Sequence, residues 1–212
     1  MDRPKYWRVG HKSNPLGFVP WSKVTFEHRF DDPRGEFRTV YAAESPLTAF
    51  REVLSRYRLN SQTIARLKEE YPDLSDDDLP KGGISKSWRD TTDIAGAALD
   101  LDGQLVDLSS DVIRSNLVRR HADLLSDHAI THLDVPEMTT ERRAFTQDLA
   151  RRLYDDGAAA VRTISRRDSR PMVAVFEGRG ELVPDGSLDV VMSEGSVALR
   201  QVIHEWHLEL PD

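Results

Sequence analysis

Apolar residues recur at helical spacing most clearly around residue 50. The stripe repeats every three or four residues and consists of Leu47, Phe50, Leu54 and Tyr57. This spacing predicts an amphipathic helix over residues 46 to 57. Ser45 is a candidate N-cap for this helix, because a serine oxygen can accept a hydrogen bond from a free backbone N–H. Pro46 suits the first helical position, where a missing N–H costs nothing.

The segment before this helix has the composition of a strand. Residues 36 to 43, "EFRTVYAA", are rich in aromatic and β-branched residues, which favour the pleated conformation. A turn is predicted at residues 31 to 35, because Pro33 presets φ and Gly35 accepts a positive φ. Turn, strand and helix therefore follow one another directly.

Further helices are predicted between residues 61 and 157. One begins after Ser61 and ends at Tyr71, and another is capped by Ser110 and extends to about residue 126. A third begins at Thr139 or Thr140 and ends at Gly157, where glycine can adopt the left-handed conformation. Residues 72 to 90 combine acids, prolines and glycines and predict a long surface loop, which we consider a candidate lid.

The last part of the chain is predicted to be rich in strands. "AALDLDGQLVDL" predicts a hairpin around Asp102 and Gly103. Four strands are predicted after Gly157, separated by turn residues: "AAAVRTIS", "MVAVFEG", "LDVVMSE" and "LRQVIHEWHLEL". The glycines of "GRGELV" predict a turn between strands. The fold class is therefore α+β, and residues 1 to 212 are expected to form one domain.

Composition excludes several classes of site. The chain has 212 residues and no cysteine, so disulfides and thiolate sites are impossible. Its net charge of −7 disfavours direct nucleic-acid binding. His204 and His207 would face opposite sides of the last predicted strand, so we expect no metal site there. The sequence lacks a signal peptide and a membrane-spanning apolar run, which favours a cytoplasmic protein without membrane contact.

Each of the remaining polar residues allows two interpretations. Arg8 and Arg29 could be ordinary surface arginines, and Tyr41 could be a half-buried strand aromatic. Glu52 lies nearly opposite the apolar stripe of its helix, at about 100° per residue. It therefore faces solvent or lines a cleft. Composition and spacing leave these alternatives open.

The order of motifs along the chain resembles the RES-domain family, toxins of bacterial toxin–antitoxin pairs. The resemblance rests on "YWRV", "HRF", "VYAAESPLTAFREV" and "SRR…MVAVFEG", and it covers nearly the whole chain. It implies a single mixed α/β domain related to ADP-ribosyltransferase toxins, with an NAD cleft. The implied activity is degradation of NAD by hydrolysis or phosphorolysis, with no cofactor beyond NAD itself and inorganic phosphate as a possible co-substrate.

The resemblance also implies which residues form the site. Arg29 matches the family arginine, Tyr41 the tyrosine, Glu52 the glutamate and Ser165 the serine; Arg8 matches an arginine at the start of the domain. Arg8 and Arg29 would bind the pyrophosphate, since guanidinium groups form charge-assisted hydrogen bonds with it. Glu52 would stabilise positive charge developing on the ribose.

Partners follow from the same resemblance. It implies an Xre-type antitoxin whose C-terminal part blocks the cleft, so that DNA is contacted only through the antitoxin. A hetero-oligomer with the antitoxin or a homo-oligomer is expected. The alternative activity is that of a mono-ADP-ribosyltransferase acting on a host protein. A third hypothesis is a binding module without catalytic activity.

Overall fold

The computed structural model describes residues 4–185 and 197–212, and strands of this chain form a seven-stranded sheet. Its order is β4-β5-β6-β2-β1-β3-β7, with β4 and β5 parallel and the other neighbouring pairs antiparallel. The strands are β1 (Tyr6–His11), β2 (Thr39–Ala43), β3 (Thr92–Leu101), β4 (Gln104–Asp107), β5 (Ala158–Ile164), β6 (Pro171–Phe176) and β7 (Gly180–Pro184). A mixed α/β fold is thereby confirmed.

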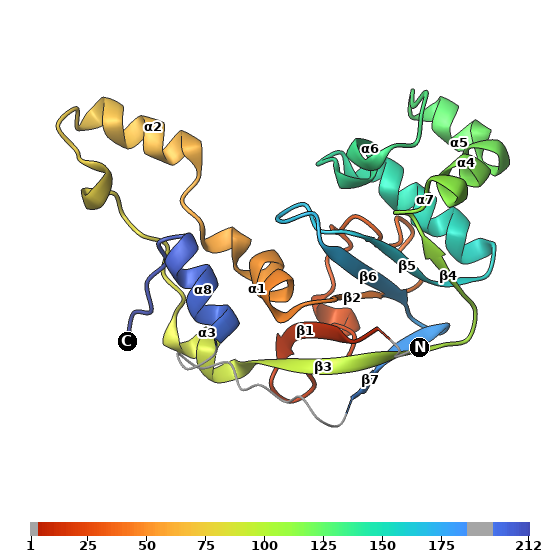
Figure 1. Cartoon of the computed structure of the whole chain (residues 1–212), viewed down its shortest axis with the longest axis horizontal. Helices are drawn as coiled ribbons and strands as arrows, with labels where there is room; N and C mark the ends of the chain where they lie inside the picture. The colour runs from red at the N-terminus through yellow and green to blue at the C-terminus, as the bar shows by residue number, and fades with distance from the viewer. Residues whose placement is uncertain (1–3, 186–196) are drawn as a thin grey trace.

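The sheet curls strongly, so that strands far apart in its order share one apolar cluster. Ala97 and Leu182, on β3 and β7, belong to the same buried cluster as Ala160 and Val175, on β5 and β6. This cluster fills one face of the sheet, while the opposite face is covered by helices. The curl thus gives the sheet an inner face made by strands and an outer face that receives helices (Figure 1).

Apart from α2, the α-helices form two groups at opposite ends of the sheet (Figure 1). The α-helices are α1 (Pro46–Leu54), α2 (Ser61–Glu70), α3 (Lys86–Thr91), α4 (Asp111–Arg120), α5 (Ala122–Asp127), α6 (Val135–Thr139), α7 (Arg143–Asp155) and α8 (Val197–Glu205). Short 3-10 helices lie at Trp21–Lys23, Ser55–Tyr57 and Asp76–Asp78. Helices α1, α3 and α8 gather at one end and α4 to α7 at the other, with β2, β5 and β6 between them. None of the helices in the described residues is long and apolar enough to cross a membrane.

The turn, strand and helix predicted around residues 31 to 57 are present, although β2 begins at Thr39 and α1 ends at Leu54, where a 3-10 helix continues to Tyr57. Ser45 caps α1 as expected, with its Oγ accepting from the Thr48 backbone N–H at 3.1 Å. Phe50 and Leu54 of the apolar stripe are fully buried. The stripe packs against a cluster that also contains Leu199 and Val202 of α8. The local sequence therefore predicts both the position of this helix and the face by which it packs against the rest of the protein.

The hairpin predicted at Asp102 and Gly103 is wrong, although both of its strands exist. β3 pairs with β1 and β7, whereas β4 pairs in parallel with β5. A type I′ turn needs positive φ at both central residues, and only Gly103, at φ 147°, has one. The two residues instead form a link between strands that lie in different parts of the sheet order.

The strand predicted at residues 199 to 210 is also wrong, because this segment begins in α8. Its apolar residues Leu199 and Val202 are three apart, and both are fully buried against α1, which is helical rather than alternating spacing. Strands β5 and β6 are confirmed. The strand predicted at residues 188 to 194 lies outside the described residues.

The boundaries of several other predicted elements differ from those in the structure. The helix expected from Ser110 to about residue 126 is divided at His121 into α4 and α5. The helix expected from Thr139 or Thr140 begins at Arg143, and it ends before Gly157 at φ 96° as predicted. The expected loop at residues 72 to 90 includes all but the last residue of α3 and a core residue, Ile84, whose side chain is fully buried. A lid role for that segment stays a prediction.

Replacing Val202 by alanine should lower the free energy of unfolding by about 2 kcal/mol, since the side chain is fully buried between α8 and α1. Val197 lies on the same helix with 74% of its surface exposed, and Val197→Ala should change stability by less than about 0.5 kcal/mol. Denaturant unfolding of both variants measures the difference. Equal effects would contradict the packing of α8 described above.

Candidate active site

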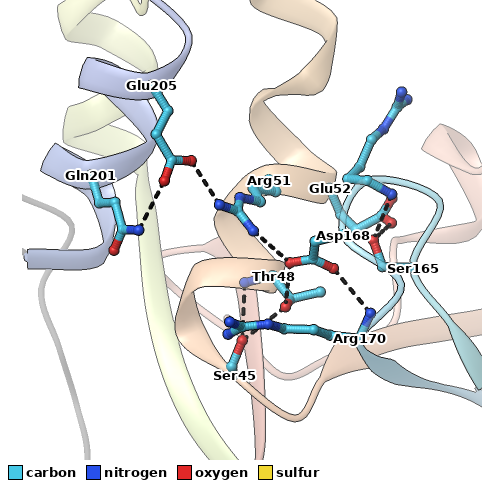
Figure 2. Close-up of polar contacts among 10 residues, drawn as sticks. Ser45, Thr48, Arg51, Glu52, Ser165, Asp168, Arg170, Gln201 and Glu205 are labelled. Atoms are coloured by element: carbon cyan, nitrogen blue, oxygen red, sulfur yellow. Dashed lines mark hydrogen bonds and ion pairs between the residues drawn. The ribbon is translucent and has the colours of Figure 1, made fainter.

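Three segments that are distant in sequence meet beside the outer face of the sheet. They are the turn at residues 28 to 32, helix α1, and the turn at residues 165 to 170 between β5 and β6. The sheet order places β2, which leads into α1, next to β6, which follows the turn. Strand pairing therefore brings α1 and the turn together, and Figure 2 shows their side chains in contact.

The central contact of this site joins Ser165 and Glu52. The Ser165 hydroxyl donates to Glu52 Oε1 at 2.6 Å, and its oxygen accepts from the backbone N–H of Arg167 at 2.9 Å (Figure 2). Ser165 is buried, whereas Glu52 is partly exposed. Glu52 Oε2 has no hydrogen-bond partner in the described part of the chain, so this oxygen is available to a ligand hydroxyl.

Arg29 links the first turn to the same site. Its Nη1 donates to the Met138 carbonyl at 2.8 Å and its Nη2 to the Ile164 carbonyl, directly before Ser165, at 3.1 Å. Burial lowers the pKa of Arg29, and the Glu52 carboxylate is the strongest opposing influence on it. A guanidinium has five N–H donors, so Arg29 keeps donors for an anion after making both carbonyl bonds.

Tyr41 holds the first turn through its hydroxyl. The hydroxyl oxygen accepts from the Phe30 backbone N–H at 2.9 Å, and the hydroxyl donates to Asp31 Oδ1 at 3.1 Å. Burial raises the pKa of Tyr41 well above its usual value, and the Asp31 carboxylate raises it further. The neutral phenol thus fixes the backbone next to Arg29, which leaves only the ring for contact with a ligand.

The structure does not bring Arg8 to this group. Arg8 lies opposite Ala95 on β3 and therefore on the inner face of the sheet, whereas Tyr41 lies opposite Ala174 on the helix-covered face. The Arg8 guanidinium donates to the Pro15 carbonyl, and burial lowers its pKa to about 10. Four of the five predicted site residues lie together, and a substrate role for Arg8 stays a prediction.

Some residues near the site were not identified from sequence, among them Asp31 and Arg167. Asp31 is buried and anchors Tyr41, but the sequence indicated only a turn there. Arg167 is exposed, its backbone contacts Ser165, and its charge influences Arg29. In the described residues its guanidinium has no ion pair. The basic run "SRRDSR" at residues 165 to 170 was the available signal in the sequence.

The chemistry of the site is that of a carboxylate, a hydroxyl and guanidinium groups. In residues 4–185 and 197–212, no group of three or more histidine, aspartate or glutamate side chains could hold a metal ion. The surface hollow of about 750 Å³ beside α8 is lined by none of the predicted site residues. The arrangement suits recognition of an anion next to a hydroxylated group that gains positive charge.

Comparison with known proteins identifies a family and a solved structure of similar fold. The RES domain family matches residues 5–193. The crystal structure of the M. tuberculosis MbcT-MbcA toxin-antitoxin complex contains a chain similar to this one, with 12% identity and a TM-score of 0.50. The match covers 95% of this chain and 87% of that chain. No match is found among curated proteins. At this identity the structural match indicates a common fold.

Replacing Tyr41 by phenylalanine should lower the free energy of unfolding by about 1–3 kcal/mol, because Asp31 and the Phe30 N–H lose a partner in a buried setting. Tyr71→Phe is a matched control, since Tyr71 is 54% exposed, and it should cost less than about 0.5 kcal/mol. Chemical denaturation measures both. A Tyr41→Phe variant as stable as the control would show that the hydroxyl does not fix the turn.

Proposed function

This chain belongs to the RES-domain family, and from that membership we propose that it is a toxin of a toxin–antitoxin system that degrades NAD. The proposed reaction breaks the bond between nicotinamide and ribose. The observation that carries the proposal is the 2.6 Å contact between Ser165 and Glu52, which holds a carboxylate beside Arg29. Such a group suits a substrate that combines a diphosphate with a sugar that becomes cationic.

Glu52 is the proposed catalytic carboxylate. When the C–N bond breaks, its electron pair leaves with nicotinamide, and the ribose acquires oxocarbenium character. A carboxylate fixed next to the sugar stabilises this charge more in the transition state than in the ground state. Ser165 occupies Oε1, so the unpaired Oε2 would bind a ribose hydroxyl. Nicotinamide departs as a neutral molecule, so the step as proposed uses no metal.

The remaining residues would hold the substrate. Arg29 retains N–H donors after its two carbonyl bonds and would bind the diphosphate. Arg167 is exposed next to Ser165 and would assist it. The ring of Tyr41 would contact the cationic nicotinamide or its ribose, because an aromatic face attracts a cation.

The acceptor is proposed to be water or inorganic phosphate. Either oxygen nucleophile would form a bond to the ribose carbon as nicotinamide leaves, giving ADP-ribose or its phosphorylated form. The second candidate function is transfer of ADP-ribose to a protein. It rests on the same residues, because Glu52 and Arg29 would serve any acceptor that approaches the same carbon.

An antitoxin is the proposed partner. NAD loss harms any cell that makes this protein, so its activity requires a specific inhibitor. We propose an Xre-type antitoxin that covers Glu52 and Arg29, with DNA contacts made by the antitoxin. The acidic net charge of −7 supports that division, since it disfavours direct contact with DNA.

Purified protein incubated with NAD should release nicotinamide without any cell extract. Two parallel reactions, with and without inorganic phosphate, identify the acceptor by chromatography and mass spectrometry of the ADP-ribose product. A phosphorylated product with a faster rate in phosphate assigns phosphorolysis, and ADP-ribose in both reactions assigns hydrolysis. Nicotinamide release that depends on added host protein, with label on that protein, would favour the transferase.

Glu52→Gln should reduce kcat for nicotinamide release by about 10²-fold or more, because the charge that stabilises the transition state is lost. The amide oxygen can still accept from Ser165, so the fold should be retained. Glu69→Gln is the matched control, because Glu69 is exposed on α2, and it should keep full activity. If Glu52→Gln turned over NAD like the control, Glu52 would not be the catalytic carboxylate.

A further inference from the structure

Helix α1 holds the turn between β5 and β6 at two separate points. The first is the contact of Glu52 with Ser165, and the second lies at Asp168, three residues further along the same turn (Figure 2). The turn is closed by backbone bonds from the Ser165 N–H to the Arg170 carbonyl and from the Ser169 N–H to the Ser165 carbonyl. A displacement at Asp168 would therefore be transmitted to Ser165.

Asp168 makes its contacts with α1 in a nearly buried setting. Its Oδ2 accepts from Thr48 Oγ1 at 2.9 Å and from Arg51 Nη1 at 3.0 Å, and its side chain is only 7% exposed. Burial opposes ionisation, but the hydrogen bonds from Thr48 and Arg51 outweigh it and lower the pKa of Asp168. Asp168 is thus a charged anchor that is covered by its partners and is not open to a substrate.

Arg51 connects this anchor to the C-terminal helix. Its Nη2 donates to Glu205 Oε2 on α8 at 2.7 Å, while Glu205 Oε1 accepts from Gln201 at 2.8 Å (Figure 2). The guanidinium is planar, so binding one carboxylate with each terminal nitrogen restricts its orientation. Arg51 also directly precedes Glu52 in α1. The same turn of helix therefore carries the catalytic carboxylate and the cation that fixes the opposing turn.

We propose that Asp168, held by Thr48 and Arg51, is a positioning residue that keeps the Ser165 hydroxyl on Glu52 in the geometry required for NAD cleavage. This inference rests on the proposed function for its effect on catalysis. Asp168 acts through Ser165 and does not touch NAD. Its loss should impair the transition state more than substrate binding, because a displacement of about 1 Å in a reacting group costs up to about 10²-fold in rate.

The kinetic test compares Asp168→Ala with the wild-type protein in nicotinamide release. We expect kcat to fall by about tenfold or more while KM for NAD changes by less than about threefold. Asp168→Asn keeps the shape and removes the charge, so it should give a smaller fall and serves if the alanine variant does not fold. Unchanged kcat in both variants would overturn the inference.

Glu177→Ala is the matched control for loss of an ion pair. Glu177 pairs with Arg38, whose side chain is 17% exposed, as is the side chain of Arg51. Glu177 directly follows β6, at the end of that strand away from Ser165. This variant should keep kcat within about twofold of the wild type. If it lost as much activity as Asp168→Ala, general destabilisation would explain both results, and the positioning role would be rejected.

A double variant tests whether Asp168 acts through Ser165. In a Ser165→Ala background, the further change Asp168→Ala should reduce kcat by less than about threefold, since residues that act as a unit are not additive. A full additional tenfold loss would show that Asp168 acts independently of Ser165 and would overturn the proposal.

Amide exchange gives a measurement that does not depend on NAD. The Arg167 N–H donates to Ser165 Oγ and has no bond to Asp168, so its exchange rate reports the position of the serine. Asp168→Ala should raise that rate by about tenfold or more, whereas Glu177→Ala should not. Unchanged exchange rejects the positioning role. If Asp168→Ala shows the raised exchange rate but the wild-type protein cleaves no NAD, the proposed function alone is rejected.

Discussion

The hydrogen bond between Ser165 and Glu52 is the interaction on which the site depends. It joins residues 113 positions apart in sequence, one on the helix after β2 and the other on the turn after β5. It forms because β2 and β6 are neighbours in the sheet. The apolar stripe of α1 packs against α8 while Glu52, on the same helix, contacts the turn, so the core and the site agree on one orientation of this helix.

Local signals predicted the elements that depend on nearby residues. Ser45 and Pro46 determine where α1 begins, and Gly157 determines where α7 ends, because each acts within one turn of helix. The hairpin at Asp102 and Gly103 and the strand at residues 199 to 210 were wrong for the opposite reason. Their outcome depends on partners distant in sequence: β7 and β5 for the first, α1 for the second.

The site was predictable only in part. The phase of α1 indicated that Glu52 points away from the packing stripe, and family resemblance supplied its companions Arg29, Tyr41 and Ser165. Periodicity could not identify Asp168 or Asp31, since polar residues in turns have no pattern that reveals a buried partner. It also could not indicate on which face of the sheet Arg8 lies, because that depends on strand register.

The curled sheet ends in short strands on both sides. β4 has four residues and β7 has five, and β7 ends at Pro184, which lacks a backbone donor. The Asp102 N–H donates to the Arg179 carbonyl and the Gln104 N–H to the Gly157 carbonyl, so the link between β3 and β4 is itself bonded. In residues 4–185 and 197–212, the two edges of the sheet therefore offer little strand backbone for another chain to extend. Short edge strands and a terminal proline disfavour edge-to-edge pairing with another chain.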